Sequence, residues 1–376
     1  MALFKNLIMI GMCLLLLSCG GGHKVHLQET EIPLEYASYL KMSEGDGYTH
    51  VTIKNPWDTT KILHSYILVP DSLNLSDEYP EGTLIRTPIK QSVVFSSVHG
   101  SLLDELESIG TIKGVCDTEY LNNPTLVGRL KNNNIADCGS SMAPDVEKII
   151  SLRPDAVLLS PYQDKSSYTR LIELGVPIIE CADYMETNPL GRAEWVKFYA
   201  ALVGKKDKGD AIFNNVKNEY EQLKSLISKV SFRPKVLTEL KQSDSWFLPA
   251  KSSTMGILIE DAGGKLPDIV EGEGGSKAYT PEKVLVDAAD SEIWLIKYFS
   301  DNEMTYSQLS KESPIYKNID AFKKKNIYAC NTSKKQYYEE VPFHPHWLLA
   351  DFISIFHPES GVKPYPGKSY YSRLSD

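Results

Sequence analysis

Two similar stretches lie far apart in the chain, and their repetition limits the folds that are open to it. PDVEKIISLRPDAVLLSP runs from Pro144 to Pro161, and PEKVLVDAADSEIWLI runs from Pro281 to Ile296. In each stretch a Glu-Lys pair is followed by two aliphatic residues, and an Asp stands eight positions after the Glu. A Pro near the start of each unit can open a helix, because its missing N–H costs nothing there. We interpret the repeat as one helix-to-strand unit that is used by two lobes of similar architecture.

The sequence around both units alternates short β-branched runs with amphipathic helical patterns. From Ser92 onward the runs VVFS, TIKGV, DAVLLS and VPIIECA are separated by helical pieces such as LLDELESIG and YTRLIELG. After Arg233 the same alternation returns with KVLTEL, IWLIKY and NIYAC. Strands that alternate with helices predict right-handed βαβ units and parallel sheets. The predicted fold class is therefore α/β, with two Rossmann-like lobes at residues 91–188 and 233–376, the second ending in a C-terminal helix.

The segment between the lobes, residues 189–232, has a helical pattern that no strand interrupts. Its second half predicts a helix from about Lys206 to Val230, with apolar residues spaced three and four apart on one face. These residues are Ile212, Val216, Tyr220, Leu223 and Ile227. At 1.5 Å per residue such a helix reaches about 35 Å, which is enough to bridge two domains. We expect it to be a rigid connector.

Residues 20–90 have a different composition and are predicted to form a tether followed by a β-rich extension. Tyr48–Ile53 and Ile62–Val69 alternate apolar and polar side chains and have turn residues nearby. This period of two predicts short antiparallel strands.

Residues 1–19 have the pattern of a secretion signal. An apolar run from Leu7 to Leu17 follows Lys5, and it is shorter than the roughly 20 residues that span a membrane comfortably. The ending Leu-Leu-Ser-Cys, before three glycines, is similar to a bacterial lipobox in which Cys19 receives the lipid. This pattern predicts a lipoprotein anchored to a membrane of the cell envelope, on the periplasmic side. An ordinary cleaved signal and a short retained anchor are the alternatives.

The charge and the cysteines narrow the chemistry further. A formal net charge of -9 argues against general binding of nucleic acid, which needs a surplus of Lys and Arg. If the mature protein lies outside the cytoplasm, its four remaining cysteines can be oxidised. A disulfide between Cys116 and Cys138 is one possibility, and buried free thiols are the preferred one. The spacing of the cysteines does not match a zinc site.

From about Ile89 to Glu359 the sequence resembles the FecB/BtuF-like, class III periplasmic binding proteins of iron-complex and cobalamin ABC importers, within the TroA-like superfamily. The resemblance is carried by SVVFSSVHGSLLDELESIG, the repeated units, GILIEDAGGK and PHWLLADFISIFHPE, in this order. It implies a monomer that holds a metal chelate in a cleft between its lobes and delivers it to a FecCD/BtuC-type permease in the inner membrane. The ligand would be a ferric siderophore, haem or cobalamin, with no separate cofactor.

The resemblance also gives roles to particular residues. Glu147 and Glu282 match the acidic side chains that dock on basic pockets of the permease, where carboxylates can form bidentate bonds with Arg. A simpler reading is that a Glu in a first helical turn is favoured by the helix dipole. The extension before Ile89 departs from the family pattern, and the sequence leaves open whether it covers one lobe or alters access to the cleft.

The ligand is expected at the carboxyl ends of the parallel strands. Aromatic side chains recur there, and they suit a large flat or chelated ligand, although they could equally form a rim of core packing. The candidate ligand-binding residues are Ser97, His99, Tyr120, Ser141, Met142, Tyr162, Trp246, Tyr279, Tyr298 and Tyr338. His99 could bind a haem iron or cobalt axially or make an ordinary polar contact. The pair in His344-Pro345-His346 is not expected to share a metal, because the two side chains point to different faces.

Other classes of function have less support. The sequence contains no Gly-rich phosphate loop, GxSxG elbow or metalloprotease motif, so no enzymatic activity is predicted. A lipid-anchored protein that captures a metal chelate without an ABC permease is the remaining alternative.

Overall fold

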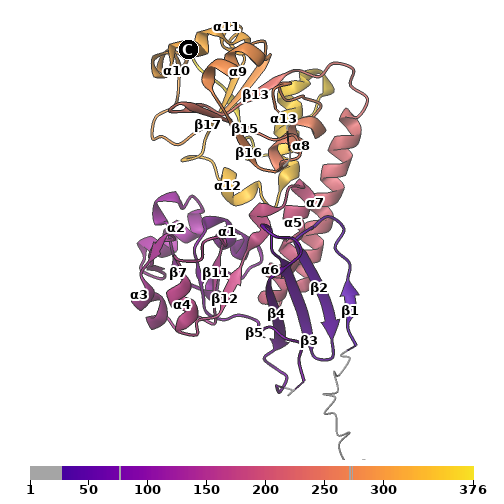
Figure 1. Cartoon of the computed structure of the whole chain (residues 1–376), viewed down its shortest axis with the longest axis vertical. Helices are drawn as coiled ribbons and strands as arrows, with labels where there is room; N and C mark the ends of the chain where they lie inside the picture. Colours follow the sequence, from indigo (N-terminus) through magenta and orange to yellow (C-terminus); the bar gives the residue numbers. More distant parts are fainter. Residues whose placement is uncertain (1–27, 76–77, 271, 273) are drawn as a thin grey trace, which may run out of the picture.

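The computed structural model describes residues 28–75, 78–270, 272 and 274–376. It contains two α/β lobes, three connecting helices and a separate β-sheet beside the N-terminal lobe (Figure 1). The signal segment and Cys19 lie outside the described residues. The predicted fold class of two lobes with parallel sheets, a long connecting helix and a β-rich extension is confirmed.

The N-terminal lobe is built on a five-stranded parallel sheet. In the order β12-β11-β6-β7-β8, its strands are Ile178–Glu180, Ala156–Leu159, Ser92–Val94, Ile112–Val115 and Ala136–Asp137. The strand order reverses between β6 and β11, which is where open α/β sheets form their binding crevices. The helices are α1 (Ser97–Glu105), α2 (Pro124–Lys131), α3 (Val146–Ser151) and α4 (Thr169–Glu173). Shorter elements are β9 (Gly139–Ser140), β10 (Ala143–Pro144), and the 3-10 turns η1 (Ile109–Thr111), η2 (Thr118–Tyr120) and η3 (Ala182–Met185).

The C-terminal lobe contains two sheets. β13 (Val236–Thr238), β17 (Ile293–Tyr298) and β18 (Ile327–Asn331) are parallel, and β19 (Ser372–Arg373) adds an antiparallel edge. The sequence did not predict the second, antiparallel sheet, which consists of β14 (Lys241–Gln242), β15 (Ser245–Pro249) and β16 (Ser276–Tyr279). The helices are α8 (Thr254–Asp261), α9 (Pro281–Asp287), α10 (Tyr306–Glu312), α11 (Asp320–Lys323), α12 (Tyr337–Glu340) and α13 (Pro345–Phe356). The 3-10 turns are η4 (Pro314–Asn318) and η5 (Pro358–Ser360).

The repeated sequence units occupy equivalent places in the two lobes. The first forms α3 and β11, and the second forms α9 and β17. The Asp of each unit, which precedes the strand of that unit, bonds to residues at the start of the neighbouring strand in the sheet. Asp155 accepts the backbone N–H groups of Lys90 and Gln91 at 2.8 and 2.9 Å, and Asp290 pairs with Lys235 Nζ at 2.6 Å. The repeat therefore encodes both the helix-to-strand turn and the anchoring of the adjacent strand.

Three helices connect the lobes: α5 (Pro189–Glu194), α6 (Val196–Leu202) and α7 (Lys206–Ile227). The 22 residues of α7 extend about 33 Å at 1.5 Å per residue. α7 packs against α6 on the N-terminal side and against α13 on the C-terminal side. Its buried stripe is the predicted one, except that Phe213 takes the place expected for Ile212.

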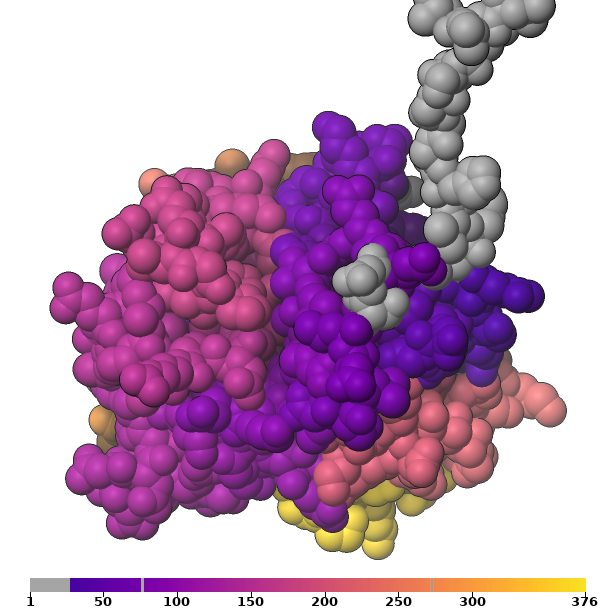
Figure 2. All heavy atoms as spheres, turned by 90° about the horizontal axis from the view of Figure 1, so that it is seen from below, coloured from indigo at the N-terminus to yellow at the C-terminus, as the bar shows by residue number. Residues whose placement is uncertain are grey.

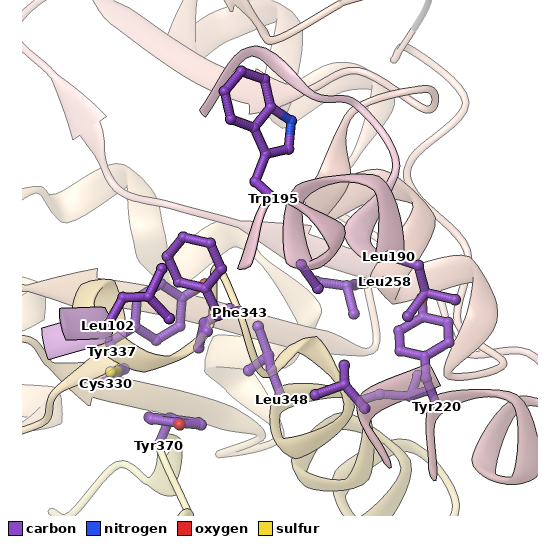
Figure 3. Close-up of a cluster of buried hydrophobic side chains, with 14 of the residues drawn as sticks. Leu102, Leu190, Trp195, Tyr220, Leu258, Cys330, Tyr337, Phe343, Leu348 and Tyr370 are labelled. Carbon is purple, nitrogen blue, oxygen red and sulfur yellow. The ribbon is translucent and has the colours of Figure 1, made fainter. Parts of the chain in front are cut away.

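One apolar core runs through both lobes and the connector. Figure 3 shows Leu102 of the N-terminal lobe in one cluster with Tyr337 and Phe343 of the C-terminal lobe, and with Trp195 of the connector. Because these side chains are buried together, a wide separation of the lobes would expose core residues to water. The fold therefore favours small adjustments of the lobes over a large hinge motion.

Cys116, Cys138, Cys181 and Cys330 are free and buried. The preferred expectation of buried free thiols is thus confirmed, and the possible disulfide between Cys116 and Cys138 is not formed. Burial raises the pKa of the Cys138 thiol to about 11, which keeps it protonated and unreactive at neutral pH.

The extension forms its own five-stranded sheet, packed beside the N-terminal lobe (Figure 2). Its strands are β1 (Thr30–Ile32), β2 (Leu40–Gly45), β3 (Tyr48–Lys54), β4 (Ile62–Pro70) and β5 (Thr83–Thr87). The first four are antiparallel as predicted, whereas β5 runs parallel to β4. Tyr66 of this sheet covers the edge of β12, because its hydroxyl donates to the carbonyl of Ile178 at 3.0 Å and accepts the N–H of Glu180 at 2.8 Å. A free strand edge is thereby protected.

Near the C-terminus a buried carboxylate holds the last segment of the chain, and it supports a prediction about pH. Asp351 accepts the N–H groups of Tyr370 and Tyr371 at 2.9 and 2.8 Å, and burial raises its pKa from 3.8 to about 6. The folded state therefore holds this proton more tightly than the unfolded state, and the resulting stability is complete below pH 3.8 and is lost as the pH rises through about 6. From pH 4 to pH 7 the free energy of unfolding should fall by about 2 to 3 kcal/mol relative to the Asp351→Asn variant.

Denaturant titrations at several pH values measure this difference. Asp301→Asn, at an exposed position of the same lobe, serves as the control and should run parallel to the parent protein. Parallel curves for Asp351→Asn as well would contradict the raised pKa.

Candidate ligand-binding cleft

A first cavity of about 180 Å³ lies at the carboxyl ends of β6, β7 and β11, where the strand order reverses. Hydroxyl groups dominate its polar lining. The residues around it are Phe95, Ser96, Ser97, Asp117, Tyr120, Ser141, Leu159, Ser160, Tyr162, Ser167 and Tyr168. Asp117 adopts a left-handed backbone conformation with φ 51°, and its carboxylate accepts the N–H of Ser141 at 2.8 Å. This bond fixes the loop that carries Ser141 against the cavity.

A second cavity of about 710 Å³ lies between the lobes, in the size range of small-molecule sites. One side comes from η3 and α5, and the other from α8, β16, β17 and α12. Its lining is rich in aromatic, thioether, aliphatic and proline side chains. These include Tyr184, Met185, Met255, Leu258, Tyr337, Tyr338, Val341, Pro189, Pro249, Pro342 and Pro345.

The two cavities are neighbours along the interface of the lobes. Tyr184 lines the second cavity, and its hydroxyl donates to the carbonyl of Pro161, next to Tyr162 in the first. We call the two cavities together the interlobe cleft. Its first part offers hydroxyl groups and its second part offers apolar rings, so that a ligand with an apolar body and a polar edge could contact both.

Direct contacts hold the lobes together beside this cleft. The ring of Tyr120 meets the edge of Phe299, with centroids 5.8 Å apart. The N–H of Asn122 donates to the buried carboxyl of Glu339 at 3.2 Å, and its amide donates to the carbonyl of Thr332 at 2.8 Å. The structure therefore shows the lobes in contact at the η2 end of the cleft.

The cations of the second cavity are paired with carboxylates. Lys297 Nζ bonds to Glu239 and lies 5.6 Å from the centroid of the Tyr337 ring. Burial lowers the pKa of Lys297, but the negative charge of Glu239 outweighs this effect and the net pKa is raised, so the side chain stays cationic. Arg192 Nε donates to Asp183 at 3.1 Å. These two cations provide N–H donors in a mostly apolar lining, and acidic groups of a ligand could accept hydrogen bonds from them.

Half of the predicted ligand residues line this cleft. Ser97, Tyr120, Ser141 and Tyr162 surround the first cavity, and Tyr338 lines the second. Three others lie outside both linings. Met142, next to Ser141, is 63% exposed. Tyr298 donates its hydroxyl to Glu303 at 2.6 Å, and Tyr279 packs half-buried against the core opposite Trp246.

Two predicted ligand residues are buried, and the structure corrects both expectations. His99 is 1% exposed and lies inside α1 rather than in a loop, with Nε2 3.4 Å from Asp183 Oδ1 and its ring stacked on Tyr199. Trp246 is 0% exposed and donates Nε1–H to the carbonyl of Thr238 at 2.9 Å. Side chains alternate along β15, so Trp246 points inward and Phe247 points outward. The exposed aromatic residue is therefore Phe247, one position after the residue that was predicted.

Sequence reasoning missed several residues of the cleft. In the first cavity these include Asp117, Ser160 and Ser167, and in the second Tyr184, Arg192 and Lys297. Lys297 could have been found from the sequence. A Lys near the end of the apolar strand IWLIKY is expected to be buried only if a carboxylate pairs with it. No sequence pattern indicated the contribution of η3 and α8 to the cavity, because it depends on how the lobes are placed.

Glu147 and Glu282 occupy equivalent positions in the first turns of α3 and α9, and both are exposed. The helix N–H groups are capped by other side chains, Asp145 in α3 and Thr280 in α9. Pro281 begins α9 as predicted, whereas Pro144 precedes the cap of α3.

Within the described part of the chain, no group of three or more His, Cys, Asp and Glu side chains is arranged to hold a metal ion. His344 Nε2 instead bonds to Glu105 at 2.8 Å, and its ring stacks on Trp347. Among the same described residues, no helix has the length and hydrophobicity needed to cross a membrane.

The sequence was compared with known protein families. Residues 96–333, more than half of the chain, match the family model described as periplasmic binding protein. This chain belongs to that family. Both cavities of this periplasmic binding protein draw most of their lining from the matched region.

Individual proteins extend the comparison. An uncharacterised lipoprotein of Methanocaldococcus jannaschii is 25% identical over 290 residues, which covers 74% of this chain and 67% of the relative. The Fe(3+)-citrate-binding protein YfmC of Bacillus subtilis is 27% identical over 266 residues, covering 69% and 78%. A crystal structure of a periplasmic haem-binding protein from Pseudomonas aeruginosa aligns with a TM-score of 0.60 at 15% identity, covering 77% of this chain and 99% of that chain. The structural match supports the two-lobe fold of this periplasmic binding protein.

Proposed function

We propose that this protein is the substrate-binding lipoprotein of an ABC importer, which captures an iron complex or cobalamin and delivers it to a FecCD/BtuC-type permease. The observation that carries the proposal is the interlobe cleft, which joins a hydroxyl-lined cavity at the strand reversal to a larger aromatic cavity. Family membership and the relative that binds Fe(3+)-citrate support this class of ligand. Lipid attachment at Cys19 agrees with the relatives that are named lipoproteins.

The chemistry of the cleft supports a ligand with a broad apolar body. Tyr337, Tyr338 and Tyr184 offer ring faces, which bind flat organic groups well. Lys297 and Arg192, each paired with a carboxylate, add N–H donors to the second cavity, and the serine hydroxyls of the first cavity add polar partners. Haem and ferric siderophores combine rings or chelating groups with acidic or polar edges. We propose that the metal arrives inside its chelate. Among the described residues, no group of three or more His, Cys, Asp and Glu side chains is arranged to hold a bare metal ion.

The exposed first turns of α3 and α9 support docking on a permease. An exposed apolar side chain follows each glutamate three or four positions later in the same helix, and this spacing places the two on one face. These are Ile150, at 38% exposure, and Val286, at 82%. An acidic group beside an exposed apolar residue is the kind of small patch that a partner protein can cover. One such patch on each lobe would hold both lobes of the protein on the permease at once.

Binding of an iron complex tests the proposal. We expect the mature protein to bind at least one of haemin, ferric citrate, a ferric hydroxamate or cyanocobalamin, measured by calorimetric titration. Replacing Tyr162 or Tyr338 by Ala should weaken the best binder by about 1 to 3 kcal/mol, because each removes an aromatic contact in the cleft. Phe232→Ala, at an exposed position of the connector that is 58% accessible, is the matched control and should bind normally. If none of the four complexes binds, the proposed function is wrong.

A further inference from the structure

The β-rich extension contributes directly to the wall of the second cavity. Tyr39 and Pro56 line this cavity together with residues of both lobes. Neither lies within residues 96–333, which match the family model. We propose that the extension is a third wall of the ligand cleft, and that Tyr39 is a specificity-determining residue for a large ligand with an apolar, ring-bearing body. This inference rests on the proposed function and assigns part of its selectivity to the extension.

Buried carboxylates hold the segment before β2 in a fixed position. Glu194 in α5 accepts the backbone N–H groups of Glu35, Tyr36 and Ala37 at 3.0, 2.8 and 3.0 Å. Glu186 accepts the N–H groups of Ser38 and Tyr39, each at 2.9 Å. Five consecutive N–H groups are thus bound by two carboxylates. Because charge-assisted bonds of this kind are strong, the segment up to Tyr39 is held firmly on α5 and on Glu186 just before it.

Glu186 joins the extension to the two lobes at the edge of the cavity. Its carboxylate also accepts Nε1–H of Trp195 at 3.0 Å, and its backbone carbonyl accepts the hydroxyl of Thr254 at 3.0 Å. Thr254 begins α8 of the C-terminal lobe, and Glu186 itself lines the cavity. The Tyr39 side chain is therefore placed where the extension, the connector and the C-terminal lobe meet.

The approach of the extension also depends on a glycine. A side chain at Gly191 would place its Cβ 2.7 Å from the backbone carbonyl oxygen of Tyr36, which is closer than real contacts allow. The extension and α5 are therefore fitted to each other at backbone level, as expected for a permanent part of the fold.

A second set of contacts reaches the first cavity. His64 of the extension bonds to the buried carboxylate of Glu180 at 3.0 Å, and the same carboxylate accepts the hydroxyl of Tyr168 at 2.9 Å. Tyr168 lines the first cavity. The extension thus lines the second cavity directly through Tyr39 and Pro56. It is linked to the first cavity indirectly, because His64 and Tyr168 bond to the same carboxylate of Glu180.

The other residues that line the second cavity indicate the chemistry of the ligand. Met185, Met255 and Tyr337 lie in the same cavity, whose volume is about 710 Å³. Thioether and aromatic groups adapt to flat apolar surfaces, whereas a small hydrated anion would gain little from them. The wall formed by Tyr39 and Pro56 should therefore matter for a flat ring system such as haemin and matter little for ferric citrate.

Substitution of Tyr39 in the full mature chain tests the inference. The anchoring bonds use backbone N–H groups, so Tyr39→Ala should keep the thermal unfolding temperature close to that of the parent protein. We expect this variant to bind haemin, or the apolar-cavity dye 1-anilinonaphthalene-8-sulfonate, about tenfold more weakly. Ferric citrate affinity should change less than threefold. The matched control is Tyr79→Ala, because Tyr79 belongs to the same extension but packs on Tyr48, away from the cleft.

The outcomes separate the inference from the proposed function. If the dye binds in a way that depends on Tyr39 but no iron complex and no cobalamin binds, the third-wall inference is supported and the proposed function is refuted. Binding of haemin and dye that is the same in the parent protein, Tyr39→Ala and Tyr79→Ala would overturn the third wall and leave the proposed function standing. If the parent protein binds none of these molecules, both are refuted.

Discussion

Exchanging Glu147 and Glu282 together for Arg is expected to abolish uptake of the ligand by cells while leaving the affinity of the purified protein unchanged. Both glutamates are exposed in the first turns of α3 and α9, away from the lining of the cleft. A carboxylate that meets a basic pocket gains a charge-assisted bond, and an Arg in its place brings like charges together at a cost of several kcal/mol. Since each lobe would lose its contact, we expect uptake to fall by about a hundredfold or more, with intermediate values for the single exchanges.

Uptake of radiolabelled iron complex in cells that lack the native gene measures this effect. Glu173 and Glu260, exposed in α4 and α8, provide a control with the same change of charge, one residue on each lobe. Normal uptake by the Glu147→Arg, Glu282→Arg double variant would remove the docking role. A loss of ligand affinity in that variant would show that the glutamates act on binding instead.

Removing the carboxylate of Glu194 should produce the largest loss of stability. Glu194 is 0% exposed, accepts three backbone N–H groups of the extension and pairs with Lys197 Nζ at 3.1 Å. Glu194→Ala leaves buried donors without a partner, and we expect the free energy of unfolding to fall by about 3 to 5 kcal/mol. Because the lost bonds lie between α5 and the extension, hydrogen exchange should rise first in residues 35–39.

Urea titrations followed by circular dichroism measure this loss. Glu221→Ala is the control, since the exposed Glu221 accepts the Tyr36 hydroxyl of the same segment, and it should cost less than about 1 kcal/mol. Equal losses for the two variants would contradict the account of how the extension is attached.

Local patterns in the sequence were sufficient for the architecture. The repeated unit predicted equivalent helices and strands in the two lobes, and the apolar stripe predicted α7, which ends at Ile227 rather than near Val230. Both signals depend only on the spacing of neighbouring residues, which a sequence shows directly. The β-rich extension was also recognisable, because its alternation of side chains is local.

Which residues line the cleft depends on contacts between residues far apart in the sequence, and the predictions of these residues were partly wrong. His99 follows β6 and Trp246 follows β13 in the chain, as the ligand residues of open sheets do, yet α1 and the register of β15 turn both side chains inward. The docking of the extension relies on bonds such as Glu35 N–H to Glu194, between residues 159 positions apart. Such a pairing has no local signature, because a buried Glu in a helix looks like any other Glu in the sequence.

The position of the metal in a complex tests the central claim most directly. Crystals of the mature protein grown with the tightest-binding complex can be measured at the absorption edge of its metal. The account predicts one anomalous peak inside the interlobe cleft, with the chelate in contact with Tyr162 on one lobe and Tyr338 on the other. A metal peak on the outer surface of either lobe, with the cleft occupied only by solvent, would contradict it.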